Sequence, residues 1–352
     1  MVVSAELNSP DVRVLIPPTL SQDAAQPAPG HARLLRFAGD TMGTTWRVLC
    51  LDADDRLTVT VQDAIQVVLD QMVQQMSNWR SDSDISRFNQ AAASTWVPLP
   101  PDCFHVVATA LQVARLSGGA YDPTAAALVN LWGFGPAPRR DRAPDLTQVL
   151  RAREDCGWGR LEVDVARSCI YQPGGMALDL CAIAKGFAVD AVSAMLSESG
   201  LVHHLVEIGG ELRGAGIKPD GLPWWVDLEA PPFEECTTPN VVPQQDRIAL
   251  HDLAVATSGD YRRYFIDPAQ RQRYAHTIDP RTGYPASHAL ASVTVIHAQC
   301  MMADAWSTAL TVLGPQAGLD VANRHQLAAR FIVRTPTGFR ETLSAAYAAM
   351  LE

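Results

Sequence analysis

The sequence lacks several features that would place it in a familiar class of protein. It contains no apolar run of about 18 residues, so no transmembrane helix is expected. The seven cysteines include no CxxC pair and no zinc-binding spacing, and we interpret them as reduced thiols in apolar surroundings. Lys and Arg number 28 against 38 Asp and Glu, and this net charge of −10 argues against non-specific nucleic-acid binding. An anionic substrate is still compatible with this charge, because a bound metal supplies local positive charge.

The amino-terminal residues carry no recognisable export signal. Residues 1–10 have no basic flank followed by an apolar run, and no lipobox-like cysteine precedes the rest. The sequence as written therefore predicts a cytoplasmic protein, or a periplasmic one if an export signal was trimmed. Residues 1–30 are rich in Pro, Ala, Ser and Gln, and we expect a flexible arm there. The apolar content of 47% is ample for a core, and we expect residues 31–352 to form one domain.

Hydrophobic periodicity separates a helix-rich first half from a strand-rich second half. Apolar residues at helical spacing predict helices over residues 58–79, 101–116, 146–153, 184–199 and 302–313. Strands are expected over residues 34–51, with a sharp feature at Met42-Gly43-Thr44, and then over 161–165, 169–172, 204–208, 211–217, 224–229, 249–256, 273–278 and 292–297. A final helix–strand unit closes the chain. Runs of helices followed by runs of strands predict an α+β fold rather than a doubly wound sheet.

Asp304 and Thr308 are four residues apart on a predicted helix, so their side chains share one face. A carboxylate and a hydroxyl near a helix start could coordinate Mg²⁺ through oxygen. Alternatively, the aspartate caps the helix and the threonine bonds back to the helix backbone. The pair alone does not decide between these interpretations.

A second polar segment joins a predicted strand end to a helix start. Asp179 ends the strand, and Lys185 falls in the first turn of the helix that opens at Ala184. A lysine beside free backbone amides would make a phosphate-binding site. The glycine spacing of a Walker A motif is absent. The alternative is a capping aspartate and a solvated lysine.

Glycine-rich turns and aromatic residues accompany these segments. Gly209-Gly210 between two strands predicts a hairpin turn, or a close backbone approach to a ligand. Gly118-Gly119 stops a helix just before Tyr121 and Asp122. Trp79, at the end of the first long helix, could stack on a planar ring or fill the core. The segment from Leu131 to Gly135, which includes two aromatic residues, is more typical of core.

His276 precedes a turn that reads Asp279-Pro280-Arg281-Thr282-Gly283. A lone histidine after a strand is usually structural. Beside a metal and a phosphate, it would instead be suited to act as a general base.

Taken together, these segments resemble the ApbE family of FAD:protein FMN transferases over nearly the whole chain, from about Leu34 onward. Each motif alone is weak, and their number and order make the resemblance specific. The matching segments are Met42 to Trp46, Ser77 to Asn89, Gly119 to Pro123, Leu131 to Gly135, Asp179-Leu180 with Ala184-Lys185-Gly186, Ile208 to Gly210, Ala256 to Tyr261, His276 to Gly283, and Ala303-Asp304 with Thr308.

The resemblance implies an ApbE-like α+β fold, with mixed or antiparallel sheets and two lobes around a flavin cleft. It implies Mg²⁺-dependent transfer of FMN from FAD to a threonine or serine of an acceptor protein, with release of AMP. By position, it implies metal contacts from Ala182, Asp304 and Thr308. The implied flavin contacts are Met42, Trp79, Ala120, Tyr121, Asp122, Asp179, Lys185 and Ile278. His276 and Asp179 are the candidate catalytic residues, His276 as the base that deprotonates the acceptor hydroxyl.

Two positions depart from the family pattern. Trp79 stands where the family often has tyrosine, which keeps ring stacking but loses the phenol hydroxyl. Cys181-Ala182 replaces the small Gly or Ser usual there, a change that a backbone carbonyl ligand tolerates. Two other functions stay open: a Mg²⁺-dependent FAD pyrophosphatase, in which water replaces the acceptor hydroxyl, and a flavin-binding protein without catalysis. A pure carrier would need neither the base nor the metal ligands.

Overall fold

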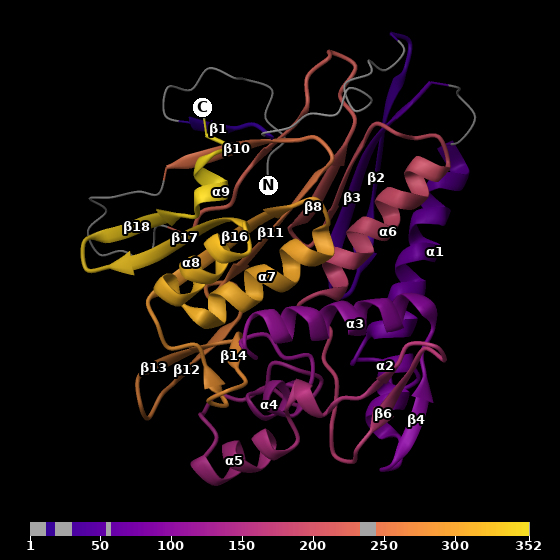
Figure 1. Cartoon of the computed structure of the whole chain (residues 1–352). Helices are drawn as coiled ribbons and strands as arrows, with labels where there is room; N and C mark the ends of the chain where they lie inside the picture. Colours follow the sequence, from indigo (N-terminus) through magenta and orange to yellow (C-terminus); the bar gives the residue numbers. More distant parts are fainter. Residues whose placement is uncertain (1–11, 18–29, 54–57, 233–243, 352) are drawn as a thin grey trace.

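The computed structural model describes residues 12–17, 30–53, 58–232 and 244–351. Helices and mainly antiparallel sheets alternate along these ranges, so the α+β class expected from the sequence is confirmed. No helix within them is both long enough and apolar enough to cross a bilayer. Figure 1 shows the strands of the largest sheet in the upper half of the molecule, with most helices below and beside them.

The largest sheet has eight strands in the order β18-β17-β16-β11-β8-β7-β3-β2, each antiparallel to its neighbours. Its central strands are almost entirely buried, because helices cover one face and smaller elements the other. The strand bounds are β2 Arg33–Thr41, β3 Thr44–Asp52, β7 His204–Ile208, β8 Glu211–Ala215, β11 Leu253–Gly259, β16 Leu290–His297, β17 Ala328–Thr335 and β18 Gly338–Leu343.

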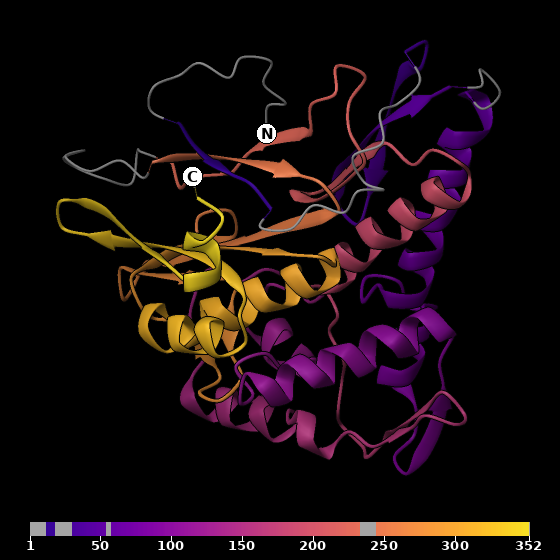
Figure 2. The same cartoon turned by 45° about the horizontal axis from the view of Figure 1, so that its top comes forward.

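Helices α6 (Ala184–Glu198) and α7 (Cys300–Leu313) pack on this sheet and on each other. Helix α7 is buried almost all round, because α3 (Pro101–Leu116) contacts it on the side away from the strands. Figure 2 shows this layering, with orange α7 lying between the sheet and purple α3. Helices α1 (Thr58–Met76) and α8 (Pro315–Arg324) extend the layer by packing on α6 and α7, respectively.

Gly186 permits the close approach of α6 and α7. A Cβ at this position would collide with the carbonyl oxygen of Cys300 and would lie 2.8 Å from Cα of Met301. Only a residue without a side chain therefore lets the start of α6 pack against the start of α7. This contact brings Lys185 beside Asp304.

Smaller elements surround one end of the sheet. Trp132, which follows α4 (Ala126–Leu131), packs against Phe265 and Tyr274 of the hairpin formed by β12 (Tyr264–Asp267) and β13 (Gln272–Ala275). Its indole nitrogen also donates a hydrogen bond to the carbonyl of Gly283 (2.8 Å). The expectation that this aromatic segment belongs to the core is therefore confirmed. The smaller elements are α2 Asp84–Gln90, β4 Thr95–Pro98, α4 Ala126–Leu131, α5 Leu146–Glu154, a 3₁₀ turn Trp158–Arg160, β5 Val163–Asp164, β6 Cys169–Gln172, β12 Tyr264–Asp267, β13 Gln272–Ala275, β14 Ile278–Asp279, β15 Tyr284–Pro285 and α9 Ala345–Ala348.

The amino-terminal segment differs from its predicted form where the structure describes it. Residues Val12–Leu15 form β1, which pairs in parallel with β10 (Gln245–Leu250), and β9 (Trp224–Asp227) completes that small sheet. Arg13 forms ion pairs with Asp246 (2.6 Å) and Glu341 (2.6 Å). The expectation of a flexible arm is therefore wrong for residues 12–15, because a partner strand far along the chain orders them. Residues 1–11 and 18–29 of the expected arm lie outside the described residues.

Two predicted strands are each divided in the structure. The strand expected over residues 249–256 contains the turn between β10 and β11, where Asp252 adopts a left-handed backbone conformation (φ 52°). The strand expected over residues 273–278 is divided between β13 and β14, with His276 and Thr277 joining them. In each case two polar residues, His251-Asp252 and His276-Thr277, form the break, and apolar residues lie on both sides of it, so the predicted strands were extended across it. The other predicted elements begin and end within a few residues of the expected positions, whereas α2, β4, α4 and β12 were not predicted from the sequence.

Candidate active site

A cavity of about 890 Å³ lies where the end of the large sheet meets α1, α6 and α7. Every residue that was predicted from the sequence to contact the flavin, bind the metal or take part in catalysis lines this cavity. They come from segments far apart in the chain, which the fold brings together: the β2–β3 turn, the end of α1, the segment after α3, the entry to α6, the segment after β13, and α7. Their roles stay predictions.

Asp304 is buried in the second turn of α7, because the helix begins at Cys300, two residues earlier than expected. Its Oδ2 accepts a hydrogen bond from the backbone amide of Gly186 in α6 (3.1 Å). The residue at the N-cap of α7 is Gln299, so Asp304 does not cap its own helix. Thr308, one turn on, lies 3.3 Å from the hydroxyl of Ser258 on β11. Carboxylate and hydroxyl oxygens therefore face the cavity from α7 and β11 together.

Lys185 lies between two carboxylates. Its Nζ is 2.7 Å from Oε1 of Glu211 and 3.6 Å from Oδ2 of Asp304. Burial favours the neutral amine, but the two negative charges outweigh it and hold the pKa of Lys185 above its ordinary value. The lysine is therefore charged at neutral pH, and the alternative of a solvated lysine is wrong. Glu211 was not singled out as a site residue from the sequence, although it directly follows the Gly209-Gly210 turn.

The Gly209-Gly210 pair forms the tight turn between β7 and β8, with φ values of 61° and 105°. The hairpin interpretation is therefore confirmed, and Gly209 also lines the cavity. The turn places Glu211 at the start of β8 with its Oε2 buried and without a hydrogen-bond partner among the described atoms. An unpaired buried oxygen is costly, so a donor or a cation in the cavity would stabilise it.

The carboxylates of Asp179 and Asp122 form hydrogen bonds with groups in their own loops. Asp179 accepts a hydrogen bond from the amide of Cys181 (2.8 Å), which shapes the entry to α6. Asp122 accepts from the amide and the hydroxyl of Thr124 (2.8 and 2.6 Å) and from the amide of Trp158 (3.2 Å). Burial nevertheless raises the pKa of Asp122. Both carboxylates therefore fix loops at the cavity wall as well as facing it.

Several apolar and aromatic groups complete the wall. Trp79 is 52% exposed, so it does not fill the core, and its indole is free to contact a ligand. Met42 occupies the left-handed turn between β2 and β3 (φ 49°). The Tyr121 hydroxyl is buried without a hydrogen-bond partner among the described atoms. Ala120 and Ile278 are buried lining residues, and Ala182 is half-buried just before α6.

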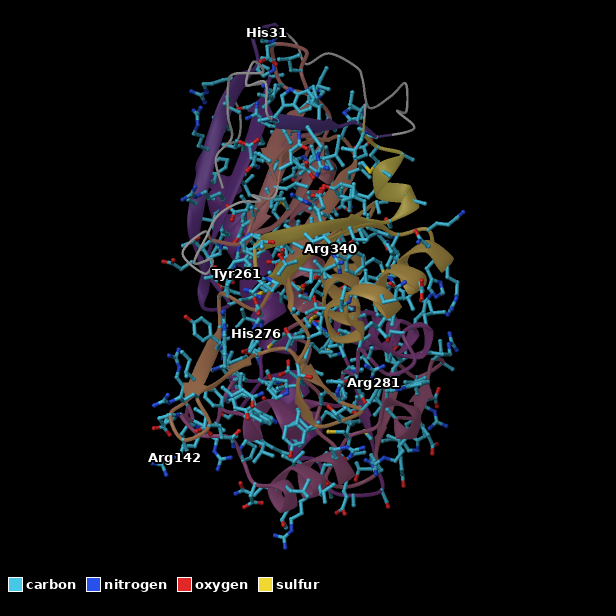
Figure 3. All side chains as sticks on the ribbon, turned by 90° about the vertical axis from the view of Figure 1, so that its left-hand side faces the viewer. His31, Arg142, Tyr261, His276, Arg281 and Arg340 are labelled. Carbon is cyan, nitrogen blue, oxygen red and sulfur yellow. The ribbon has the colours of Figure 1, made fainter. Side chains whose placement is uncertain are left out.

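His276 directly follows β13 and is labelled in Figure 3. Its Nδ1 is 3.2 Å from the carbonyl oxygen of Arg263, and this contact requires Nδ1 to carry the proton. The neutral ring then keeps a free electron pair on Nε2. Burial, reinforced by the positive charge of Arg263, lowers the pKa of His276 to about 4. The ring is therefore neutral at physiological pH, which a general base needs.

Among the described residues, no three His, Cys, Asp or Glu side chains converge into a metal-binding cluster. A cation beside Asp304 would therefore depend on neutral oxygens such as the Thr308 hydroxyl and the Ala182 carbonyl. Such a set, with few charged ligands and room for substrate oxygens, fits the way proteins bind Mg²⁺. It does not fit zinc, which prefers histidine and cysteine.

The sequence profile of the ApbE family matches residues 42–331, which covers most of the chain and the whole cavity wall. The chain belongs to the ApbE family. It is similar to the FAD:protein FMN transferases of Haemophilus influenzae, with 36% identity over 329 residues (92% of this chain and 93% of the relative), and of Vibrio cholerae, with 37% identity over 320 residues (90% and 92%).

Solved ApbE structures share the fold. The apo flavinyl transferase ApbE of Pseudomonas stutzeri superposes with a TM-score of 0.82 at 39% identity, covering 91% of this chain and 97% of the other. The flavin transferase ApbE of Vibrio cholerae gives the same TM-score at 36% identity, covering 91% and 100%. The resemblance to the ApbE family stated from the sequence motifs is therefore confirmed.

Proposed function

We propose that this ApbE chain transfers FMN from FAD to a threonine or serine hydroxyl of an acceptor protein, uses Mg²⁺ and releases AMP. The relatives named above support the transfer of FMN from FAD. The observation that carries the proposal is the cavity, in which a neutral histidine shares the wall with a lysine, two buried carboxylates and an exposed indole. Its volume of about 890 Å³ lies at the upper end of the usual range for small-molecule and cofactor sites, about 300–1,000 Å³.

In this proposal, Asp304, Thr308 and the carbonyl of Ala182 would hold Mg²⁺. When bound, the ion would offset the negative charge of the diphosphate and of the departing AMP. The buried and unpaired Oε2 of Glu211 supports a positively charged occupant in this part of the cavity. Lys185 is charged and contacts both Glu211 and Asp304, so it would bind a phosphate oxygen at the entry to α6.

His276 would accept the proton of the acceptor hydroxyl at Nε2 as the hydroxyl oxygen bonds to the phosphorus of the FMN moiety. The bond between that phosphorus and the bridging oxygen breaks, and AMP departs with the bridging oxygen. The carbonyl of Arg263 fixes the ring orientation by accepting from Nδ1 (3.2 Å). Trp79 and Met42 would contact the flavin ring, and Tyr121 would donate its unpartnered hydroxyl to it.

The proposal is tested by incubating the protein with FAD, Mg²⁺ and a protein acceptor, and by measuring covalent flavin on the acceptor and AMP in solution. His276→Ala should abolish transfer at saturating FAD while FAD still binds, and Asp304→Ala should abolish the Mg²⁺ dependence. Full Mg²⁺-dependent transfer by either variant would contradict the role proposed for that residue.

The competing functions give different products in the same assay. A pyrophosphatase would release free FMN and AMP in equal amounts and leave the acceptor unlabelled. A flavin carrier would leave FAD intact. The neutral His276, in the same cavity as the proposed Mg²⁺ ligands, favours transfer over simple binding, because binding alone does not require a base.

A further inference from the structure

Five cationic side chains line the cavity, and three of them are neutralised. Lys185 pairs with Glu211 (2.7 Å), and Arg80 pairs with Asp82 (2.9 Å). Arg262 pairs with Glu229 and also donates to the carbonyl of Gly209 (3.2 Å). The remaining two cations are Arg139 and Arg263.

Arg139 and Arg263 have no carboxylate partner within the described part of the chain. The guanidinium of Arg263 donates a long hydrogen bond (3.4 Å) to the carbonyl of Phe134, and no side-chain hydrogen bond or ion pair of Arg139 is found there. Both side chains are exposed, and both line the cavity. Two unpaired guanidinium groups at one cavity wall are a ready site for carboxylate or phosphate.

The two arginines lie on the side of the cavity that contains His276. The carbonyl of Arg263 accepts hydrogen bonds from the amide (3.0 Å) and the Nδ1 (3.2 Å) of His276. Phe134 contacts the His276 ring edge-on, with 6.3 Å between ring centroids, and it belongs to the same loop as Arg139. The loop folds back at Gly133, next to the backbone of Arg139.

The side from which the acceptor hydroxyl approaches the phosphorus determines which ligand contacts these two arginines. In an in-line displacement, the entering oxygen and the departing group lie on opposite sides of the phosphorus. If His276 takes the proton of the entering hydroxyl, the hydroxyl arrives on the His276 side. Arg139 and Arg263 then face the acceptor chain rather than the departing AMP.

The exposed surface next to Arg263 also suits a polypeptide. In β12, Phe265 points inward against Trp132, so its neighbours Tyr264 and Ile266 point outward and are 45% and 58% exposed. This face begins one residue after Arg263, and the guanidinium of Arg273 lies over its Tyr264 ring (3.8 Å). An extended chain that reaches the cavity over this hairpin would place apolar side chains on it and its polar groups near the arginines.

We propose that Arg139 and Arg263 bind carboxylate side chains of the acceptor segment close to its target hydroxyl, so acidic acceptors are preferred. This inference rests on the proposed transferase function and names the chemistry by which that site selects its partner. Long-range attraction between these arginines and an acidic acceptor would also offset the repulsion expected from a chain with a net charge of −10.

The test uses a library of 12-residue peptides, each with one threonine and randomised flanks, incubated with FAD and Mg²⁺. Flavin-labelled peptides are isolated by fluorescence and sequenced by mass spectrometry. The proteins compared are the wild type, Arg139→Gln, Arg263→Gln and the control Arg340→Gln. Arg340 is also an exposed arginine; it lies on β18, outside the cavity lining, and is labelled in Figure 3. The affinity of each protein for FAD is measured by fluorescence titration.

The wild type and Arg340→Gln should enrich Asp and Glu near the labelled threonine, and each of the other two variants should weaken that enrichment. For an acidic peptide chosen from the library, KM should rise about fivefold in Arg139→Gln and Arg263→Gln. The kcat of Arg139→Gln should stay within about twofold, and FAD affinity should be unchanged in both variants.

Two results would overturn the inference and leave the transferase intact: labelling without acidic enrichment in the wild type, or enrichment retained in both variants. Weaker FAD binding with unchanged acceptor preference would assign the arginines to the dinucleotide and also contradict the inference. If the wild type splits FAD into FMN and AMP and labels no peptide, the proposed transferase function fails, and this inference fails with it.

Discussion

Asp304 on α7 accepts a hydrogen bond from the backbone amide of Gly186 on α6 (3.1 Å), so one carboxylate joins two helices at the cavity wall. The same carboxylate lies 3.6 Å from the ammonium of Lys185. It therefore has a structural role and an electrostatic one. Variants must be compared with controls that separate the two.

The first prediction concerns the fit of α6 against α7. Gly186→Ala should destabilise the fold by about 1–3 kcal/mol, because its Cβ would meet the backbone of Cys300 and Met301, which cannot move aside cheaply. Thermal and urea denaturation measure the effect. The control is Gly159→Ala, where a Cβ meets nothing within 4 Å. Equal stabilities of the two variants would contradict the packing argument.

The second prediction concerns the cation. Asp304→Asn keeps the shape of the side chain and removes its charge, so binding of Mn²⁺, used as a spectroscopic probe for Mg²⁺, should weaken at least tenfold. Electron paramagnetic resonance of free Mn²⁺ measures this without any catalytic assay. Asp320→Asn, at an exposed position on α8, is the control and should bind Mn²⁺ like the wild type. Unweakened binding by Asp304→Asn would place the cation elsewhere.

The third prediction concerns pH. Because the pKa of His276 is lowered to about 4, activity should not fall near the ordinary histidine pKa of about 6.5, but only as the pH approaches 4. An NMR titration of the ring measures the pKa directly. Arg263→Gln should raise it, since a neighbouring positive charge is removed, whereas Arg340→Gln should not. A pKa of about 6.5 for His276 in the wild type would contradict the inference that burial and the charge of Arg263 keep this ring neutral.

The same lowered pKa has a consequence for stability. Between about pH 6.5 and pH 4, the unfolded chain binds a proton at His276 and the folded chain does not, so the stability of the fold decreases as the pH falls through this window. Burial lowers the pKa of His204 to about 4 as well, and it adds to the same slope. His276→Asn should therefore flatten the slope of unfolding free energy against pH and should not abolish it.

The fourth prediction concerns Trp79. Since the indole is 52% exposed, Trp79→Ala should change the free energy of unfolding by less than about 0.5 kcal/mol but weaken FAD binding roughly tenfold. Trp79→Tyr, which restores a stacking ring, should recover most of the affinity. Trp96→Ala removes a similarly exposed indole (41%) on β4, outside the cavity lining, and is the control. A loss of stability comparable to that of a core substitution would show that Trp79 is structural.

Much of the site could be predicted from the sequence because its residues lie in short local motifs. The four-residue spacing of Asp304 and Thr308 on α7 is an example, since helix geometry alone sets their common face. The Gly209-Gly210 hairpin turn could likewise be predicted, because two adjacent glycines lie between two predicted strands.

Other features depend on contacts between segments that are distant in the sequence, and no short sequence motif indicates them. Glu211 belongs to the site because β8 brings it to within 2.7 Å of Lys185, and no spacing in the sequence encodes that distance. The pairing of β1 with β10 joins residues more than two hundred positions apart. The break between β10 and β11 falls at Asp252, where neither glycine nor proline marks the turn.

The central claim is that FMN moves from FAD onto a protein, and the most direct test is a balance of products. The protein is incubated with FAD, Mg²⁺ and increasing amounts of an acceptor, and AMP, free FMN and protein-bound flavin are measured together. The account predicts that AMP exceeds free FMN and that flavin covalently bound to the acceptor equals the difference. Free FMN equal to AMP at every acceptor concentration, with no bound flavin, would contradict it.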